Sequence, residues 1–433
     1  MIALSSSGIE FRPNDRRDVR KPRIVIANLF LVVVALLFAV SGGLLWVLGV
    51  NYDGVTGAIA SKIHPATYLA MLTLALLIVT RRNPASYLVQ LVTKYPGTLT
   101  FLLATMLLGA YIALDGRKGI TTVFDTYLLS IAVVLIATAL DPRDLRRVEK
   151  FLHVVMAANA ALALIEYALD QRFFPYRFEG MAFEWDNRSS ALFGHPLENA
   201  LITGTYIMAL LAGGGAAMPK GLRVAAILLQ FAALVPFGGR TALLLASAMT
   251  ALWLVPRVAT LLRGQRVSLL ALAAAATIGP LVCLALGAAS VGGFFDVFTE
   301  RFADDGGSAE ARLAMFEIFD QLSVHDILLG GGADVIDSIR RTMGLEWGIE
   351  NPVVRLLLYQ GAIFTSFLVA GFVLFLWEIA RSLRPGYAMA FIFFIVVINS
   401  YESISNKSAS LARFAILMLT MFSVAEPRAE KAR

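Results

Sequence analysis

Long apolar runs, separated by short polar segments, repeat along the whole chain. Each run has enough apolar residues to cross a hydrocarbon core roughly 30 Å thick, which an α-helix spans with about 20 residues. The pattern therefore predicts an all-α integral membrane protein, in which residues 1–433 form a single polytopic membrane domain of about twelve transmembrane helices. We expect the spans near residues 24–48, 66–80, 97–114, 120–139, 151–168, 197–213, 222–238, 241–256, 268–289, 353–377, 387–401 and 410–424.

The distribution of basic residues predicts the orientation of these spans. Six of the first 23 residues are Lys or Arg, and further basic clusters lie at 81–82, 141–150 and 257–266. Lys and Arg concentrate on the cytoplasmic side of a membrane, so we place the amino terminus and these clusters in the cytoplasm. An even number of spans then returns the carboxyl terminus to the same side.

Composition supports the membrane location and limits the classes of partner. The chain is 58% hydrophobic and 16% charged, against roughly 45–50% and 25% in soluble domains. Orientation and anionic lipid headgroups account for its net charge of +6, so membrane lipids are expected partners and nucleic acid is not. The single cysteine, Cys283, excludes an intramolecular disulfide.

Two polar segments on the outer side are too long to be simple hairpins. They are residues 170–199 and residues 290–351, the latter between the ninth and tenth spans. We expect function to reside there, because loops are where binding and catalytic residues concentrate. In the second segment, apolar positions at helical spacing after Ser308 predict a short amphipathic helix over the outer face of the membrane. These positions are Leu313, Phe316, Phe319 and Leu322.

Three arginines lie in or beside the predicted membrane region, where a charge requires an ion-pair partner or a functional role. Arg240 follows a Gly-Gly turn before the eighth span, Arg312 lies on the predicted loop helix, and Arg355 lies just inside the tenth span. A charge at the membrane centre costs roughly 2.5–3.5 kcal/mol, so Arg355 is expected to face protein or a water-filled cavity. Guanidinium groups match the oxygens of a diphosphate in a bidentate way. For Arg240, a snorkelling arginine that caps the hairpin is the alternative.

Polar residues also mark the entrance to the tenth span. Glu350 and Asn351 precede Pro352, which suits the first turn of a helix. Asn351 can cap that helix, and Glu350 faces its positive end, so a structural cap and a general base are alternative roles for the glutamate.

A second candidate substrate loop lies ahead of the sixth span, in the run RSSALFGHPLENA. His195 could serve there as a base or a ligand, but no second His or Cys stands at ligand spacing, so neither a metal nor a cofactor is expected. Together with Asn351, the candidate substrate-loop residues are Arg188, His195 and Glu198.

Four of these segments resemble motifs of the O-antigen polymerase and O-antigen ligase superfamily. The similar runs are the GGR turn with Arg240, EARLAMFEIFDQLSVHDILLGGG with Arg312, RSSALFGHPLENA, and IENPVVRLLLYQGAIF with Glu350 and Arg355. The resemblance implies a GT-C-like membrane fold with about twelve spans and a large periplasmic loop between the ninth and tenth. It also implies a metal-independent glycosyltransferase that uses undecaprenyl-diphosphate-linked sugars. Ligases of this superfamily carry a histidine where this chain has Glu350, so the resemblance favours the exopolysaccharide polymerases.

The leading hypothesis is therefore a polysaccharide polymerase at the periplasmic face of the bacterial inner membrane. It would transfer a growing glycan from undecaprenyl diphosphate to a lipid-linked repeat unit, with Glu350 as general base. Arg240 and Arg312 would bind the donor diphosphate, and Arg355 would assist. A polysaccharide co-polymerase that regulates chain length is an expected partner. The alternatives are an O-antigen ligase that transfers glycan to lipid A core, and a flippase or transporter of lipid-linked oligosaccharide.

Overall fold

The computed structural model describes residues 15–54, 56–178, 180–183, 186–263, 308–345 and 348–423, with a few isolated positions between 287 and 295. The described part is almost entirely helical, with one antiparallel hairpin of two short strands. The elements before the hairpin are α1 (Asp15–Ala39), α2 (Gly42–Val47), η1 (Ile59–Lys62), α3 (Pro65–Val79), α4 (Pro84–Lys94), α5 (Pro96–Leu114), α6 (Ile120–Thr122), the π-helix η2 (Val123–Leu128), α7 (Leu129–Thr138) and α8 (Pro142–Leu169).

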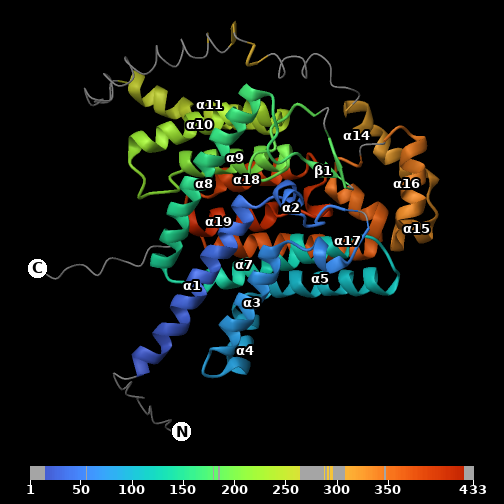
Figure 1. Cartoon of the computed structure of the whole chain (residues 1–433), viewed down its shortest axis with the longest axis horizontal. Helices are drawn as coiled ribbons and strands as arrows, with labels where there is room; N and C mark the ends of the chain where they lie inside the picture. The colour runs from blue at the N-terminus through green and yellow to red at the C-terminus, as the bar shows by residue number, and fades with distance from the viewer. Residues whose placement is uncertain are drawn as a thin grey trace, which may run out of the picture.

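The hairpin is followed by the second half of the helices (Figure 1). The elements are β1 (Arg177–Phe178), β2 (Met181–Ala182), α9 (Pro196–Leu211), α10 (Lys220–Phe237), α11 (Arg240–Leu262), α14 (Ser308–Glu317), η3 (Ile318–Gln321), α15 (Val324–Leu329), α16 (Gly332–Thr342), α17 (Pro352–Arg381), α18 (Ala388–Ile398), η4 (Ser403–Ser405) and α19 (Ser410–Met421).

Within the described residues, six helical stretches are long and apolar enough to cross a membrane, and four more helices are apolar but shorter. This confirms the prediction of an all-α membrane protein. The predicted span at 268–289 lies outside the described residues, and the total of twelve spans stays a prediction. The six long stretches are Pro96–Leu114, Ile120–Thr138, Pro142–Leu169, Lys220–Phe237, Arg240–Thr260 and Pro352–Arg381. The shorter ones are Arg23–Ala39, Pro65–Val79, Ala388–Ile398 and Ser410–Met421.

The first predicted span, 24–48, is wrong as a single helix: α1 ends at Ala39, and Ser41 caps α2 by accepting a hydrogen bond from the Leu44 amide at 3.2 Å. The helix that contains the predicted span 151–168 begins earlier than that span, because the basic cluster 141–150 forms the first turns of α8 from Pro142. A serine before two glycines and a proline at the first helical position are the local causes.

The turn between α10 and α11 is as the sequence predicts. Helix α10 ends at Phe237, Gly238 takes the left-handed conformation with φ of 64°, and α11 begins at Arg240. A glycine makes this reversal possible because a side chain would strain the backbone there. Arg240 therefore opens α11.

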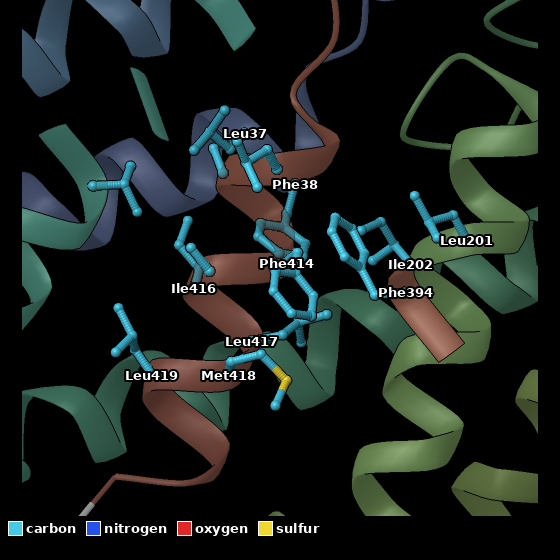
Figure 2. Close-up of a cluster of buried hydrophobic side chains, with 14 of the residues drawn as sticks. Leu37, Phe38, Leu201, Ile202, Phe394, Phe414, Ile416, Leu417, Met418 and Leu419 are labelled. Atoms are coloured by element: carbon cyan, nitrogen blue, oxygen red, sulfur yellow. The ribbon is translucent and has the colours of Figure 1, made fainter. Parts of the chain in front are cut away.

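The core of the bundle is centred on α19, which lies among α7, α8 and α9 (Figure 1). All of its residues are buried, as expected for a helix that is apolar on every side. Figure 2 shows Phe414 of α19 stacked on Phe394 of α18, with ring centroids 3.7 Å apart, and Leu37 and Ile202 arriving from α1 and α9. Side chains from α1, α9 and α18 thus pack around the central helix α19.

Helices α5 and α17 run side by side and approach through small residues. A Cβ on Gly97 of α5 would lie 2.5 Å from the Leu374 carbonyl oxygen, and one on Gly371 of α17 would lie 2.8 Å from the Phe101 Cα. Glycines on both helices let the two backbones come together, a common device between helices in a membrane.

The helices α14, α15 and α16 form a small outer unit beside the start of α17 (Figure 1). Met315 and Ile318 are buried in its own core, together with Ile336 and the α17 residues Val354 and Leu358. Leu313 and Phe316, on the stripe predicted from the sequence, are 71% and 52% exposed. The other two residues of that stripe, Phe319 and Leu322, are half-buried and pack against this core, so the predicted stripe is divided between the surface and the protein.

Replacing Gly371 with alanine should destabilise the protein. The new Cβ would meet the Phe101 backbone, so α5 and α17 would have to separate. Overpacking of this kind costs about 1–3 kcal/mol, of which better helix propensity returns about 1 kcal/mol. Thermal or denaturant unfolding in detergent measures the loss. In the matched control Gly221→Ala, the helical glycine has nothing within 4 Å of its Cβ position, and an equal loss there would contradict the close-packing argument.

Candidate functional site

Five connecting segments meet at one end of the bundle, which we call the polar end. They are residues 40–64, 115–125, 170–195, 348–355 and 399–410. The contacts that join them and the adjoining helix starts include Tyr52 Oη to Asp125 at 3.0 Å, Thr126 Oγ1 to the Asn406 carbonyl at 2.8 Å, Ser408 Oγ to Glu198 at 2.7 Å and Arg355 to Glu402 at 3.0 Å.

The start of α17 explains part of the ENP motif. The Asn351 side-chain oxygen accepts hydrogen bonds from the Val353 and Val354 amides at 2.9 and 3.0 Å, and Pro352 occupies the first helical position. Asn351 is thus the N-cap of α17, which satisfies backbone donors that would otherwise lack partners. Its oxygen is occupied by the helix.

Arg355 is paired with a residue that the sequence did not single out. Its Nη1 lies 3.0 Å from an oxygen of Glu402, and its guanidinium lies 5.0 Å from the centre of the Tyr359 ring. Glu402 also accepts from the Ile349 amide at 3.0 Å and the Asn406 side-chain amide at 3.2 Å. Both partners of the pair keep about a fifth of their side chains exposed. The pair therefore joins the mouth of α17 to the segment between α18 and α19 and still reaches solvent.

Glu350 stands one residue after the amide that Glu402 holds, and it is half-buried. Glu350 thus lies two residues before the first helical position of α17, next in the chain to the residue whose amide bonds Glu402. The positive end of α17 adds to the favourable field for negative charge at this point.

The other two candidate arginines, Arg240 and Arg312, lie on α11 and α14. Arg240 opens α11 at the polar end: the Ser189 amide bonds the Pro236 carbonyl at 2.9 Å, and Gly239 lies against Ala200. Arg240 is half-buried and takes part in interactions with its surroundings. Arg312 lies on α14, but its side chain is outside the described residues.

Arg188 and His195 of the RSSALFGHPLENA run have structural partners. Arg188 makes a two-pronged pair with Asp186, with Nε 2.8 Å from Oδ1 and Nη2 2.5 Å from Oδ2. His195 is the N-cap of α9, where Nδ1 accepts from the Leu197 amide at 3.2 Å and is 3.4 Å from the Glu198 amide. Nδ1 is therefore an acceptor already in use, which leaves no free acceptor for a base or a ligand.

Burial keeps His195 uncharged. Its ring lies 4.3 Å from the Tyr176 ring, and burial lowers the pKa of His195 to about 4, while the Glu198 carboxylate opposes that shift. Burial also raises the pKa of the Tyr176 hydroxyl, and the charges of Glu402 and Asp53 add to this effect. Near neutral pH, both rings are neutral and serve as packed walls of the polar end.

Glu198 forms a buried ion pair that the sequence did not reveal. One carboxylate oxygen lies 2.8 Å from Arg413 Nη1, and the other accepts from Ser408 Oγ at 2.7 Å and Ser410 Oγ at 2.6 Å. The side chains of Arg413 and Glu198 are 3% and 10% exposed. Arg413 also donates from Nε to the Leu37 carbonyl at 2.8 Å. Both carboxylate oxygens of Glu198 are therefore engaged, and the pair joins α1, α9 and α19.

A second group of buried charges surrounds Asp125, on the π-helix η2. Its carboxylate accepts from Tyr52 Oη at 3.0 Å, the His64 amide at 3.0 Å and Thr67 Oγ1 at 2.6 Å. Next to it, Lys407 Nζ donates to the Tyr52 carbonyl at 2.7 Å. A π-helical turn inside an α-helix frequently marks a functional region.

Lys407 also lies 3.2 Å from Asp53 and 3.4 Å above the Tyr52 ring. Burial lowers the pKa of the Lys407 ammonium and raises that of the Asp53 carboxyl, while their mutual attraction opposes both shifts. The segment 399–410, which carries Glu402, is therefore also bonded to the segment 40–64 through Lys407.

The chemistry available at the polar end is that of cations and carboxylates. Among the described residues, no group of three or more His, Cys, Asp or Glu side chains is arranged to hold a metal ion. Arg355, Glu350 and Glu402 could bind an anion and accept a proton at the mouth of α17. No protein-family model, curated protein or solved structure matches the chain.

The stability of the protein should fall as the pH drops from about 6.5 to about 4. In the folded protein the pKa of His195 is about 4, below its ordinary value near 6.5. The unfolded chain therefore binds more protons across this window, and acid favours unfolding. The His195 contribution is of the order of 2–3 kcal/mol.

The variant His195→Asn isolates this contribution. Asparagine also caps helices but does not titrate, so we expect nearly unchanged stability at pH 7.5 and a flatter decline toward pH 4. Unfolding in detergent across the pH range measures both. An identical pH dependence in the variant would show that folding does not lower the pKa of His195.

Removing one partner of the Glu198 and Arg413 pair should be more harmful than removing both charges. Arg413→Met leaves the Glu198 carboxylate buried without its cation, which costs about 3–5 kcal/mol. In Glu198→Gln with Arg413→Met, the amide oxygen still accepts from Ser408 and Ser410, so we expect a smaller loss. Unfolding of the two single variants and the double variant tests this, and purely additive losses would contradict it.

Proposed function

We propose that the protein is a polysaccharide polymerase that transfers a growing glycan from undecaprenyl diphosphate to a lipid-linked repeat unit. The observation that carries the proposal is the mouth of α17, where the ion pair of Arg355 and Glu402 lies at a positive helix end and Glu350 comes two residues before the helix begins. The likeness of IENPVVRLLLYQGAIF and the GGR turn to the O-antigen polymerase and ligase superfamily supports the same reaction class.

In the proposed reaction, an acceptor hydroxyl oxygen attacks the anomeric carbon of the donor glycan. The bond between that carbon and the diphosphate oxygen breaks, the electron pair leaves with the lipid diphosphate, and the hydroxyl proton passes to Glu350. Fixed cations stabilise the negative charge that develops on the leaving diphosphate. A positioned base contributes about 10²–10⁴-fold to the rate.

The guanidinium of Arg355 is proposed to contact the diphosphate, with Arg240 and Arg312 as further ligands. Glu402 acts through Arg355 as a positioning residue, because its oxygens are already engaged by Arg355, Asn406 and the Ile349 amide. The proposal takes Glu350 as the proton acceptor because of its place in the run IENPVVRLLLYQGAIF at the mouth of α17. Asn351, Arg188, His195 and Glu198 are left out of the reacting site because the structure gives each a structural partner.

The proposed setting is the bacterial inner membrane, with both termini in the cytoplasm and the polar end facing the periplasm. The basic segments at Arg81, Arg143 and Lys220 lie at the other ends of the helices that reach the polar end, in agreement with a cytoplasmic location for that side. The expected partners are the lipid-linked oligosaccharide and a co-polymerase that regulates chain length.

Purified protein supplied with lipid-linked repeat units should make a ladder of products without nucleotide sugar and in the presence of EDTA. We expect Glu350→Gln to lower turnover by about 10²–10⁴-fold. The matched control is Glu317→Gln on the exposed face of α14, which should leave the ladder unchanged. Glu402→Gln should weaken donor binding, and its effect should disappear in an Arg355→Ala background because the two residues act as a unit.

The assay also separates the alternatives. Transfer that requires added lipid A core would identify a ligase. Normal polymerisation by Glu350→Gln would exclude Glu350 as the base, and no transfer under either condition by folded protein would overturn the glycosyltransferase proposal.

A further inference from the structure

A cavity of about 170 Å³ lies at the opposite end of the bundle from the polar end. It is an open pocket lined by α4, by the residues that flank this short helix, and by the end of α7. Its lining from the α4 region consists of Arg81, Tyr87, Gln90, Leu91, Lys94 and Tyr95. The volume corresponds to several water molecules at about 30 Å³ each, enough to admit a small polar group.

Two cations flank the cavity, each beside an aromatic ring. The Arg81 guanidinium lies 4.5 Å from the centre of the Tyr87 ring, and Lys94 Nζ lies 5.1 Å from that of Tyr95. Arg81 Nε is buried and makes no hydrogen bond. In the described ranges, neither cation belongs to an ion pair. The cavity therefore presents positive charge and an unused donor to an incoming anion.

The outer surface of α4 is apolar. Leu88, Val89 and Val92 are 46%, 62% and 45% exposed, and α4 has no buried residue. Tyr87, Leu91 and Lys94 recur at helical spacing on the neighbouring face, which lines the cavity. A short amphipathic helix with an exposed apolar face, flanked by Arg81 and Arg82 before it and ending in Lys94, is typical of a segment that lies in the membrane interface. At that depth the cavity opens among lipid headgroups.

We infer that this cavity binds the phosphate of an anionic glycerophospholipid, with Arg81 and Lys94 as its cationic ligands. The acyl chains would then run along the apolar face of α4. Charge complementarity favours an anionic headgroup, because the ammonium of a choline headgroup would be repelled by the two cations. The basic residues on this side of the bundle increase the local concentration of anionic lipid.

Native mass spectrometry and thermal unfolding with defined lipid test this inference. The protein in detergent is titrated with phosphatidylglycerol, phosphatidylcholine or inorganic phosphate. The cavity variant is the double substitution Arg81→Gln and Lys94→Gln. Its control is the double substitution Arg82→Gln and Lys220→Gln. The control removes two exposed charges on the same side of the bundle, and neither residue lines the cavity. The single variant Lys94→Gln changes only an exposed residue and keeps the test valid if the double variant folds poorly.

We expect wild type and control to retain one phosphatidylglycerol molecule and to gain thermal stability from it. The cavity double variant should bind that lipid at least tenfold more weakly, and Lys94→Gln several-fold more weakly. Equal retention in all variants, or equal retention of phosphatidylcholine, would overturn the proposal. Full stabilisation by inorganic phosphate alone would overturn the assignment to a lipid and indicate a site for free phosphate.

Discussion

The ion pair between Glu198 and Arg413 is the interaction on which the polar end depends. Arg413 lies in the most deeply buried helix, α19, and also bonds the Leu37 carbonyl and lies 4.5 Å from the centre of the Phe193 ring. Glu198 receives hydroxyl donors from the start of α19. Charges buried in this way are costly unless they are paired and hydrogen-bonded. The pair consequently fixes how α1, α9 and α19 meet.

The same ion pair is bonded to the segment between α18 and α19, because Ser408 of that segment donates to Glu198. Partly exposed ion pairs hold that segment at both ends, since Glu402 bonds Arg355 and Lys407 bonds Asp53 and the Tyr52 carbonyl. A catalytic or binding group is effective when supporting contacts hold it near its productive geometry. The contacts around Arg355 provide this support before any substrate arrives, which fits a role in binding a charged group.

The sequence predicted the helices well because apolar runs of membrane length have few alternative structures. Local signals such as Ser41 could have revealed the break in the first span. The sequence could not show which residues pair with these charges, since Arg355 and Glu402 lie 47 positions apart and only the fold brings them together. Likewise, α14 carries apolar residues on two faces, and packing against α16 and α17 decides that Met315 is buried while Leu313 is exposed.

Gly361 interrupts α17 with φ of 79°, and the chain repairs the break from outside. The Gly331 amide donates to the Leu358 carbonyl at 3.0 Å, and Arg117 donates to the carbonyls of Gly330 and Tyr359. The first turns of α17 are therefore bonded to the outer helices as well as to the rest of their own helix. Gly361 divides α17 into two parts, and the part that carries Arg355 belongs mechanically with the outer unit as much as with the bundle.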